Sequence, residues 1–169
     1  LTKIWKDALH IGEDTTEVYV PELELIQNEL EIMNNSSIKI EGNKVSIIGD
    51  ANIDLGGVAK GYATQKVEEY LEENNIKSYL INAGSSNIAL GYKNKKDTFI
   101  IGLKKVYGGL YKKIKIANKA IVTSSLAEQH RVIDGKMYTH IINPLTGYSE
   151  NKYDIITLIG EESGYLDIL

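Results

Sequence analysis

The chain has no cysteine among its 169 residues. Thiol catalysis, thiolate metal sites and disulfide bonds are therefore excluded within this sequence, although the redox compartment stays open. No apolar run approaches the roughly 18 residues that suggest a membrane span. The net charge of -4 also gives none of the basic excess that nucleic-acid-binding domains normally carry. We therefore expect small-molecule or protein partners and no nucleic acid.

The composition is that of a folded domain. With 43% hydrophobic and 25% charged residues, the chain has enough apolar material for a core, and we expect a single domain over residues 1–169. The first residue is Leu1 rather than Met. A signal or lipid-anchor segment preceding it would be compatible with the sequence.

Hydrophobic spacing predicts a few helices and several short strands. Residues 22–33 repeat apolar side chains at helical spacing, and Pro21 is expected in the first helical turn. Alternating apolar residues on both sides of Gly42 and Asn43 predict a hairpin. Further strands are expected at residues 78–82, 98–103, 113–116 and 120–123, the first of them buried. Adjacent strands outnumber strand-helix alternations, which predicts an α+β fold with mainly antiparallel sheet.

A glycine-rich turn precedes the clearest predicted helix. Gly56, Gly57 and Gly61 cluster where helical spacing begins, at or near Lys60. Backbone N–H groups in such a turn can approach phosphate, and the lysine would add a positive charge. The alternative is a purely structural turn whose glycines serve backbone geometry. The glycine spacing matches neither the Walker loop nor the dinucleotide fingerprint.

Small polar residues are predicted to follow two strands, at residues 82–88 and at Ser124 and Ser125. Hydroxyls, amides and backbone N–H groups there could bind phosphate, although either segment alone would usually be an ordinary loop. His140 leads an apolar pair before a turn containing Pro144 and Gly147. Such a histidine is usually structural, with its ring hydrogen-bonded to a backbone carbonyl.

Four ordered segments together resemble the ApbE family of FAD:protein FMN transferases. They are residues 54–63, 82–84, 123–124 and 140–147. The resemblance extends from Trp5, in the place of the family's tryptophan-containing early helix, to Asp167. Residues 154–160 resemble the family's late strand, and residues 163–169 the beginning of its Asp-x-Leu-Ser-Thr metal motif.

The resemblance implies specific roles for residues of this chain. It implies a magnesium ion held by the backbone carbonyl of Gly57, by Asp167, and by a threonine four residues after Asp167, where this sequence has already ended. Catalytic roles fall on His140 and Asp167. The implied FAD-binding residues are Asp54, Gly56, Gly57, Lys60, Gly61, Asn82, Gly84, Thr123, Ser124, His140 and Ile141.

The implied reaction is attack of a protein threonine or serine hydroxyl on the FMN-side phosphorus of FAD, with release of AMP. His140 would take the hydroxyl proton, with Asp54 or a metal-bound water as alternatives. The resemblance further implies an acceptor flavoprotein of a bacterial electron-transfer system. It also implies an extracytoplasmic location, with the full-length protein anchored to the membrane as a lipoprotein.

Several positions depart from the family pattern. Residues 82–88 lack the second glycine of Asn-x-Gly-Gly-Asp-Ile and are one residue longer. Asn143 stands where aspartate is common, and Ser125 replaces a common glycine. A family segment with an Asp-x-Thr-x-Gly-Pro-Leu pattern would precede Leu1, so we expect the sequence to be truncated at both ends. Two alternatives stay open: an FAD-hydrolysing relative without a protein acceptor, and a flavin-binding module without chemistry.

Overall fold

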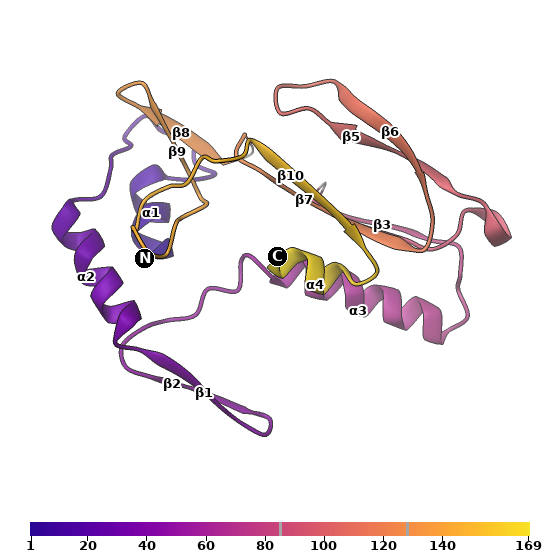
Figure 1. Ribbon diagram of the computed structural model, residues 1–169, viewed down its shortest axis with the longest axis horizontal. Coiled ribbons are helices and arrows are strands. Elements are labelled where there is room, and N and C mark those ends of the chain that lie inside the picture. The colour runs from indigo at the N-terminus through magenta and orange to yellow at the C-terminus, as the bar shows by residue number, and fades with distance from the viewer. Residues whose placement is uncertain (85, 128) are drawn as a thin grey trace. The chain divides into compact units, whose positions relative to one another are not determined.

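The computed structural model describes residues 1–84, 86–127 and 129–169. Two compact units are present, one formed by residues 1–54 and 126–153 and the other by residues 55–125 and 154–169. Both combine helices with antiparallel strand pairs (Figure 1), so the predicted α+β class is confirmed. The expectation of a single domain stays a prediction. Ser85, part of the polar segment predicted to face phosphate, lies outside the described residues.

The first unit is organised around Trp5. Its indole Nε1 donates to the Gly147 carbonyl at 2.7 Å, and its ring stacks on Tyr138 with 5.6 Å between centroids. Leu9 and Ile26 complete the buried cluster. The elements of this unit are α1 (Thr2–Leu9), α2 (Leu23–Asn34), β1 (Ser37–Glu41), β2 (Lys44–Ile48), β8 (His130–Ile133) and β9 (Lys136–Thr139).

The predicted hairpin is confirmed as β1 and β2, which pair antiparallel. Only Gly42 of the two expected turn residues has a positive φ, at 60°. Ile38 pairs with Ile47 and Ile40 with Val45, so four apolar side chains share one face, and all four are exposed.

Hairpin β8–β9 was not predicted from the sequence. It turns through Asp134 and Gly135, with φ values of 50° and 77°. An Asp-Gly pair between alternating apolar residues is among the strongest hairpin signals, because both turn residues must adopt positive φ. The signal was therefore present in the sequence.

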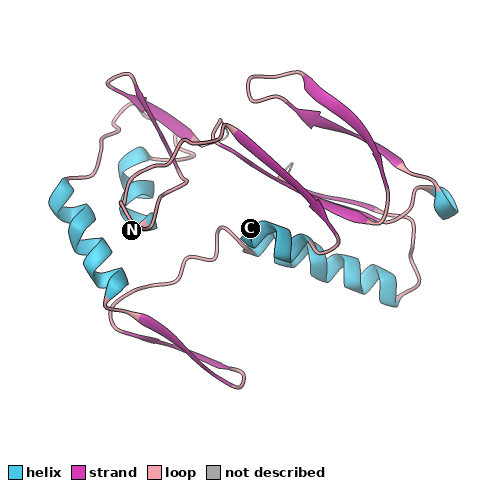
Figure 2. Ribbon diagram, viewed as in Figure 1, coloured by secondary structure: helices cyan, strands magenta, loops and turns pink. Residues whose placement is uncertain are grey.

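The second unit is built on a four-stranded antiparallel sheet in the order β10-β7-β4-β3. Figure 2 shows α3 and α4 lying side by side along this sheet. Ala120 and Val122 pack with Leu166 of α4. The elements are α3 (Ala59–Glu73), β3 (Leu80–Ala83), β4 (Asn87–Leu90), the short 3-10 helix η1 (Asn94–Lys96), β5 (Phe99–Lys104), β6 (Leu110–Ile116), β7 (Lys119–Ser125), β10 (Ile155–Gly160) and α4 (Ser163–Ile168).

Side-chain alternation divides the sheet into two faces. Asn87 and Ala89 of β4 pair with Val122 and Ala120, and this face receives the helices. The other face carries Leu90 and Ile121, which pack against the β5–β6 hairpin. Alanine at the helix side lets α3 and α4 approach the sheet closely.

Three local predictions were wrong. Pro21 lies outside α2, which begins at Leu23 after Glu22 as N-cap. The strand predicted as buried is β3, an edge strand whose Leu80 is 48% exposed, because among the described residues β3 pairs with β4 alone. Ser124 and Ser125 do not follow β7 but belong to it, because β10 continues the backbone ladder alongside them.

Candidate functional site

The glycine-rich turn leads directly into α3. Leu55 accepts backbone hydrogen bonds from Val58 and Ala59, and the helix begins at Ala59, one residue before the predicted Lys60. A side-chain β-carbon added at Gly57 would meet no atom within 4 Å. The space beside Gly57 is therefore open on the side where a side chain would lie, so a ligand could approach the backbone of this turn from that side.

Asp167 reaches the first turn of α3 from α4. Its Oδ2 accepts the Gly61 N–H at 2.8 Å. A β-carbon at Gly61 would lie 2.5 Å from both the Asp167 β-carbon and the Ser163 carbonyl oxygen. Ser163 in turn donates its hydroxyl to the Gly61 carbonyl at 2.9 Å. Gly61 is thus needed for the close approach of the two helices rather than for phosphate contact alone.

This contact changes the hydrogen bonding of Gly57. In a continuous α-helix, the Gly61 N–H would donate to the carbonyl four residues earlier, which is that of Gly57. The N–H donates to Asp167 instead, and no hydrogen bond to the Gly57 carbonyl is found among the described residues. The Gly61 N–H that a continuous helix would pair with the Gly57 carbonyl is therefore bound by the Asp167 carboxylate.

Lys60 lies on the same turn. Its ammonium donates to the Ser86 hydroxyl at 2.6 Å, and the Ser86 carbonyl accepts the Thr123 N–H at 2.7 Å. These contacts connect α3 to the loop before β4 and to β7. The structure therefore brings together Lys60, Gly61, Thr123 and Asp167 of the predicted site within the second unit, through Ser86 and the α3–α4 contact.

The remaining predicted residues of this unit are arranged differently. Asn82 is exposed on β3, and Gly84 follows this strand with a φ of 75°. The Thr123 hydroxyl is 3.0 Å from that of Thr157 on β10, and Ser124 is exposed on β7. The Thr123 side chain therefore contacts the neighbouring strand, β10, within the sheet.

Asp54 and His140 belong to the first unit. Asp54 forms an exposed ion pair with Lys6, with 2.7 Å between Oδ2 and Nζ. Lys6 and Gln129 line a hollow of about 450 Å³, a volume within the range of small-molecule sites. Gln129 also accepts from His140, so each of the two predicted flavin residues contacts a residue lining this hollow.

His140 has one ring nitrogen against a carbonyl. Its Nδ1 lies 3.3 Å from the Gln129 carbonyl oxygen. Since a carbonyl can only accept, Nδ1 carries the proton in the neutral ring and Nε2 keeps its lone pair. The ring is thus hydrogen-bonded to a backbone carbonyl, as expected for a structural histidine. The same hydrogen bond leaves the Nε2 lone pair available to accept a proton. The neighbouring Ile141 N–H donates to the Thr139 hydroxyl at 3.2 Å.

The turn after His140 is held by Asn143. Its side-chain Oδ1 accepts the Leu145 N–H at 2.8 Å, and its Nδ2 donates to Glu150 at 2.9 Å. Asn143 therefore supports the turn, and its amide donates a hydrogen bond that an aspartate at this position could not.

A carboxylate cluster lies farther along α3. The Tyr79 hydroxyl is 3.4 Å from Glu68 and 3.2 Å from Glu72. Burial, reinforced by the charge of Glu72, raises the pKa of Glu68 to about 7 despite the hydrogen bond from Tyr79. Burial and the same two carboxylates raise the pKa of Tyr79. No motif in the sequence indicated this cluster.

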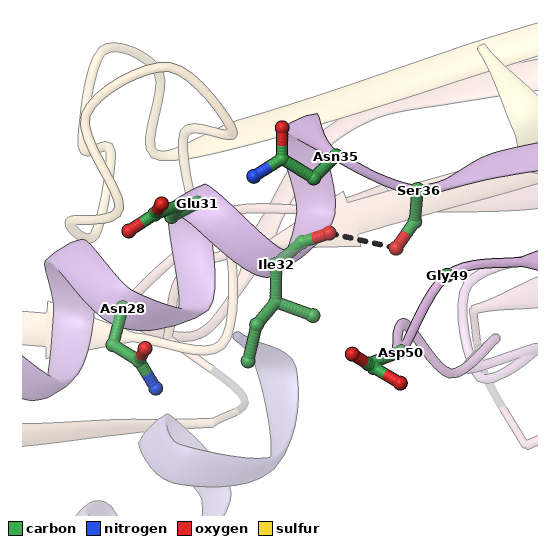
Figure 3. A pocket seen from close by; sticks show the side chains of 7 residues that line it. All are labelled: Asn28, Glu31, Ile32, Asn35, Ser36, Gly49 and Asp50. Atoms are coloured by element: carbon green, nitrogen blue, oxygen red, sulfur yellow. Dashed lines mark hydrogen bonds between the residues drawn. The ribbon is translucent and has the colours of Figure 1, made fainter.

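A second hollow, of about 280 Å³, lies in the first unit between the end of α2 and the turn after β2. Figure 3 shows Ser36 donating to the Ile32 carbonyl beside it, with Asp50 across the hollow; the hydrogen bond measures 2.7 Å. None of the predicted site residues lines it. We therefore do not place the catalytic site in this hollow.

The oxygen donors of Asp167 and Gly57 are of the kind that magnesium binds. Among the described residues, no group of three histidine, cysteine, aspartate or glutamate side chains could hold a metal. Magnesium often binds through one carboxylate, neutral oxygens, water and substrate phosphates. Each carboxylate oxygen of Asp167 has a lone pair beyond its hydrogen bond. Asp167 and the Gly57 carbonyl are therefore compatible ligands.

No helix in the described part of the chain has the length and apolarity needed to cross a bilayer.

Two curated relatives are similar in sequence to this chain. An FAD:protein FMN transferase of Klebsiella pneumoniae (strain 342) is 29% identical over 170 residues, covering 96% of this chain and 50% of the relative. One of Treponema pallidum is 27% identical over 129 residues, covering 69% of this chain and 36% of the relative. The chain thus spans half or less of the length of these curated relatives.

Solved structures show the same fold. The ApbE protein of Thermotoga maritima matches with a TM-score of 0.82 and 26% identity, over 98% of this chain and 53% of that one. The Pseudomonas stutzeri flavinyl transferase ApbE matches in fold with a TM-score of 0.78 and 19% identity, over 98% of this chain and 52% of that one. The ApbE family model matches residues 1–169 in full. The chain therefore belongs to the ApbE family.

Proposed function

We propose that the protein transfers FMN from FAD to a threonine or serine hydroxyl of an acceptor flavoprotein, with magnesium as cofactor and AMP as the leaving group. One observation carries the assignment. Asp167 is hydrogen-bonded to Gly61 at the start of α3, while Gly57, on the turn that leads into this helix, has open space where a side chain would lie. The names of the similar proteins support flavin transfer as the activity.

The proposed chemistry is a phosphoryl-type substitution. The acceptor hydroxyl oxygen forms a bond to the FMN-side phosphorus, the bond from that phosphorus to the pyrophosphate bridging oxygen breaks, and AMP leaves. Lys60 and the N–H groups at the start of α3 bind the phosphates and hold them in position. Magnesium on Asp167 and the Gly57 carbonyl would neutralise charge on the phosphate oxygens.

His140 is proposed as the group that takes the proton of the attacking hydroxyl. Its Nε2 has the lone pair that this role needs, because the Gln129 carbonyl fixes the proton on Nδ1. The proton returns to solvent after AMP leaves. Asp54, already paired with Lys6, is proposed to contact the flavin nucleotide rather than to act as base.

The acceptor and the location follow from the resemblance alone. We propose an acceptor flavoprotein of a bacterial electron-transfer system. We also propose an extracytoplasmic location in which the intact protein is anchored to the membrane by a lipid.

The test uses the intact protein with FAD, magnesium and an acceptor that carries an Asp-x-x-Ser/Thr-Gly-Ala-Thr-like site. Mass spectrometry should find an FMN-sized gain on the acceptor, abolished by EDTA and by Asp167→Asn. The asparagine still accepts the Gly61 N–H but removes the charge. AMP release with an unmodified acceptor would indicate FAD hydrolysis instead, and FAD binding without AMP release would indicate a binding module.

A further inference from the structure

Asn87 is a fully buried polar residue in the middle of the sheet. It begins β4, pairs with Ala83 of β3 and Val122 of β7, and has 0% of its surface exposed. Its backbone is therefore fixed by strands on both sides. The resemblance to the ApbE family implies no role for Asn87.

The side-chain amide of Asn87 holds the carboxylate of Asp167. Nδ2 donates to Oδ1 of Asp167 at 3.2 Å, while the Gly61 N–H binds the other carboxylate oxygen at 2.8 Å. Two neutral donors thus orient this carboxylate without cancelling its charge. The ammonium of Lys60 is bound to the Ser86 hydroxyl at 2.6 Å.

The other end of the same amide has no partner. Oδ1 of Asn87 is buried and accepts no hydrogen bond among the described residues. Rotating the amide would not help, because it would place Oδ1 against the Asp167 carboxylate, where acceptor would face acceptor. A buried acceptor without a donor costs free energy. A donor that enters the site, such as water carried by a hydrated cation, would supply the missing partner.

We propose that Asn87 is a positioning residue for a divalent cation, orienting Asp167 through Nδ2 and accepting a hydrogen bond through Oδ1 from water that enters with the cation. This inference rests on the proposed function, because it assigns a further residue to the magnesium site. Residues that hold metal ligands in place commonly change metal affinity 10- to 100-fold when they are replaced.

The test measures Mn²⁺ affinity in the intact protein with FAD present, by electron paramagnetic resonance of free Mn²⁺. Asn87→Leu keeps the side-chain size but removes both polar atoms, and we expect affinity to fall about 10-fold or more. Ser163→Ala is the matched control. It removes a buried hydrogen bond to Gly61 at the same helix junction, and it should lower the melting temperature while leaving Mn²⁺ affinity within about twofold.

Asn87→Asp supplies a readout that a merely structural residue would not give. A second carboxylate beside Asp167 repels it when no cation is present and attracts a cation more strongly. The melting temperature of this variant should be lower than that of the parent without metal. It should rise more than the parent's when Mg²⁺ is added.

The outcomes separate the two proposals. Equal Mn²⁺ affinity in the parent and Asn87→Leu would overturn the role of Asn87. The role of Asn87 would also be overturned if the parent protein bound no Mn²⁺. The same holds if Mg²⁺ did not raise the melting temperature of Asn87→Asp more than that of the parent. A parent that binds Mn²⁺ through Asp167 but transfers no FMN contradicts the proposed function and leaves the positioning role supported.

Discussion

The carboxylate of Asp167 accepts the backbone N–H of Gly61 at 2.8 Å, although 106 positions separate the two residues in the chain. The hydrogen bond connects the last helix to the first turn of α3. The absence of a side chain at Gly61 permits it, since a β-carbon there would lie 2.5 Å from the Asp167 β-carbon. The packing of α3 on α4 and the proposed cation site therefore depend on the same glycine.

The first prediction separates the two glycines of this turn. Gly61→Ala should destabilise the protein by about 1–3 kcal/mol and weaken magnesium binding, because the new methyl group pushes α4 away. Gly57→Ala is the control, since its methyl group would meet no atom. Urea unfolding gives the stabilities. Equal stability of the two variants would contradict the close approach at Gly61.

The second prediction concerns the core of the first unit. Gly147 and Gly135 have φ values of 75° and 77°, but only Gly147 faces the Ile26 side chain closely. Gly135→Ala should cost about 1 kcal/mol from backbone strain alone. Gly147→Ala should cost about 2–4 kcal/mol, because crowding adds to that strain. The difference between the urea midpoints of the two variants gives the cost of crowding at Gly147. Similar losses of stability in both variants would contradict that crowding.

The third prediction is a pH dependence set by Glu68. Its pKa of about 7 in the folded protein exceeds the ordinary value of 4.5, so the folded state binds this proton more tightly than the unfolded chain does. Stability from this group is present at low pH and is lost as the pH rises through about 7. Because the carboxylate is partly exposed, we expect on the order of 1–2 kcal/mol between pH 5 and pH 8.

Glu68→Gln should reduce this slope and stabilise the protein at pH 8, as measured by urea unfolding across the pH range. Glu73→Gln removes an exposed carboxylate of the same helix and controls for net charge. A Glu68→Gln variant with the parent's pH profile would show that burial of Glu68 has no such effect.

The fourth prediction tests His140 as a base. His140→Ala should lower the rate of FMN transfer about 100-fold while changing FAD affinity little, because a general base acts mainly in the transition state. His130→Ala is the matched control, since the His130 ring also lies against a backbone carbonyl, at 3.0 Å from Ala127. Single-turnover rates and FAD titrations separate the two effects. Unchanged transfer would leave His140 with a structural role only.

Some features could be predicted because they depend on neighbouring residues. The start of α3 follows from glycines preceding a 3.6-residue apolar repeat, and the β1–β2 hairpin follows from alternation around Gly42. The β8–β9 hairpin carried an equally local signal in Asp134 and Gly135. The predictions for β3 and β7 were wrong because burial and strand length depend on which strands pair beside them.

The sequence by itself determined the α+β class, the order of the four motifs and the family they indicate, because turn chemistry and apolar spacing act over a few residues. Only the tertiary structure decided that Asp167 binds Gly61 and Asn87, and that one oxygen of Asn87 is buried without a donor. These contacts join residues 80 or more positions apart. No local preference specifies such partners; the packing of α4 against α3 and the sheet does.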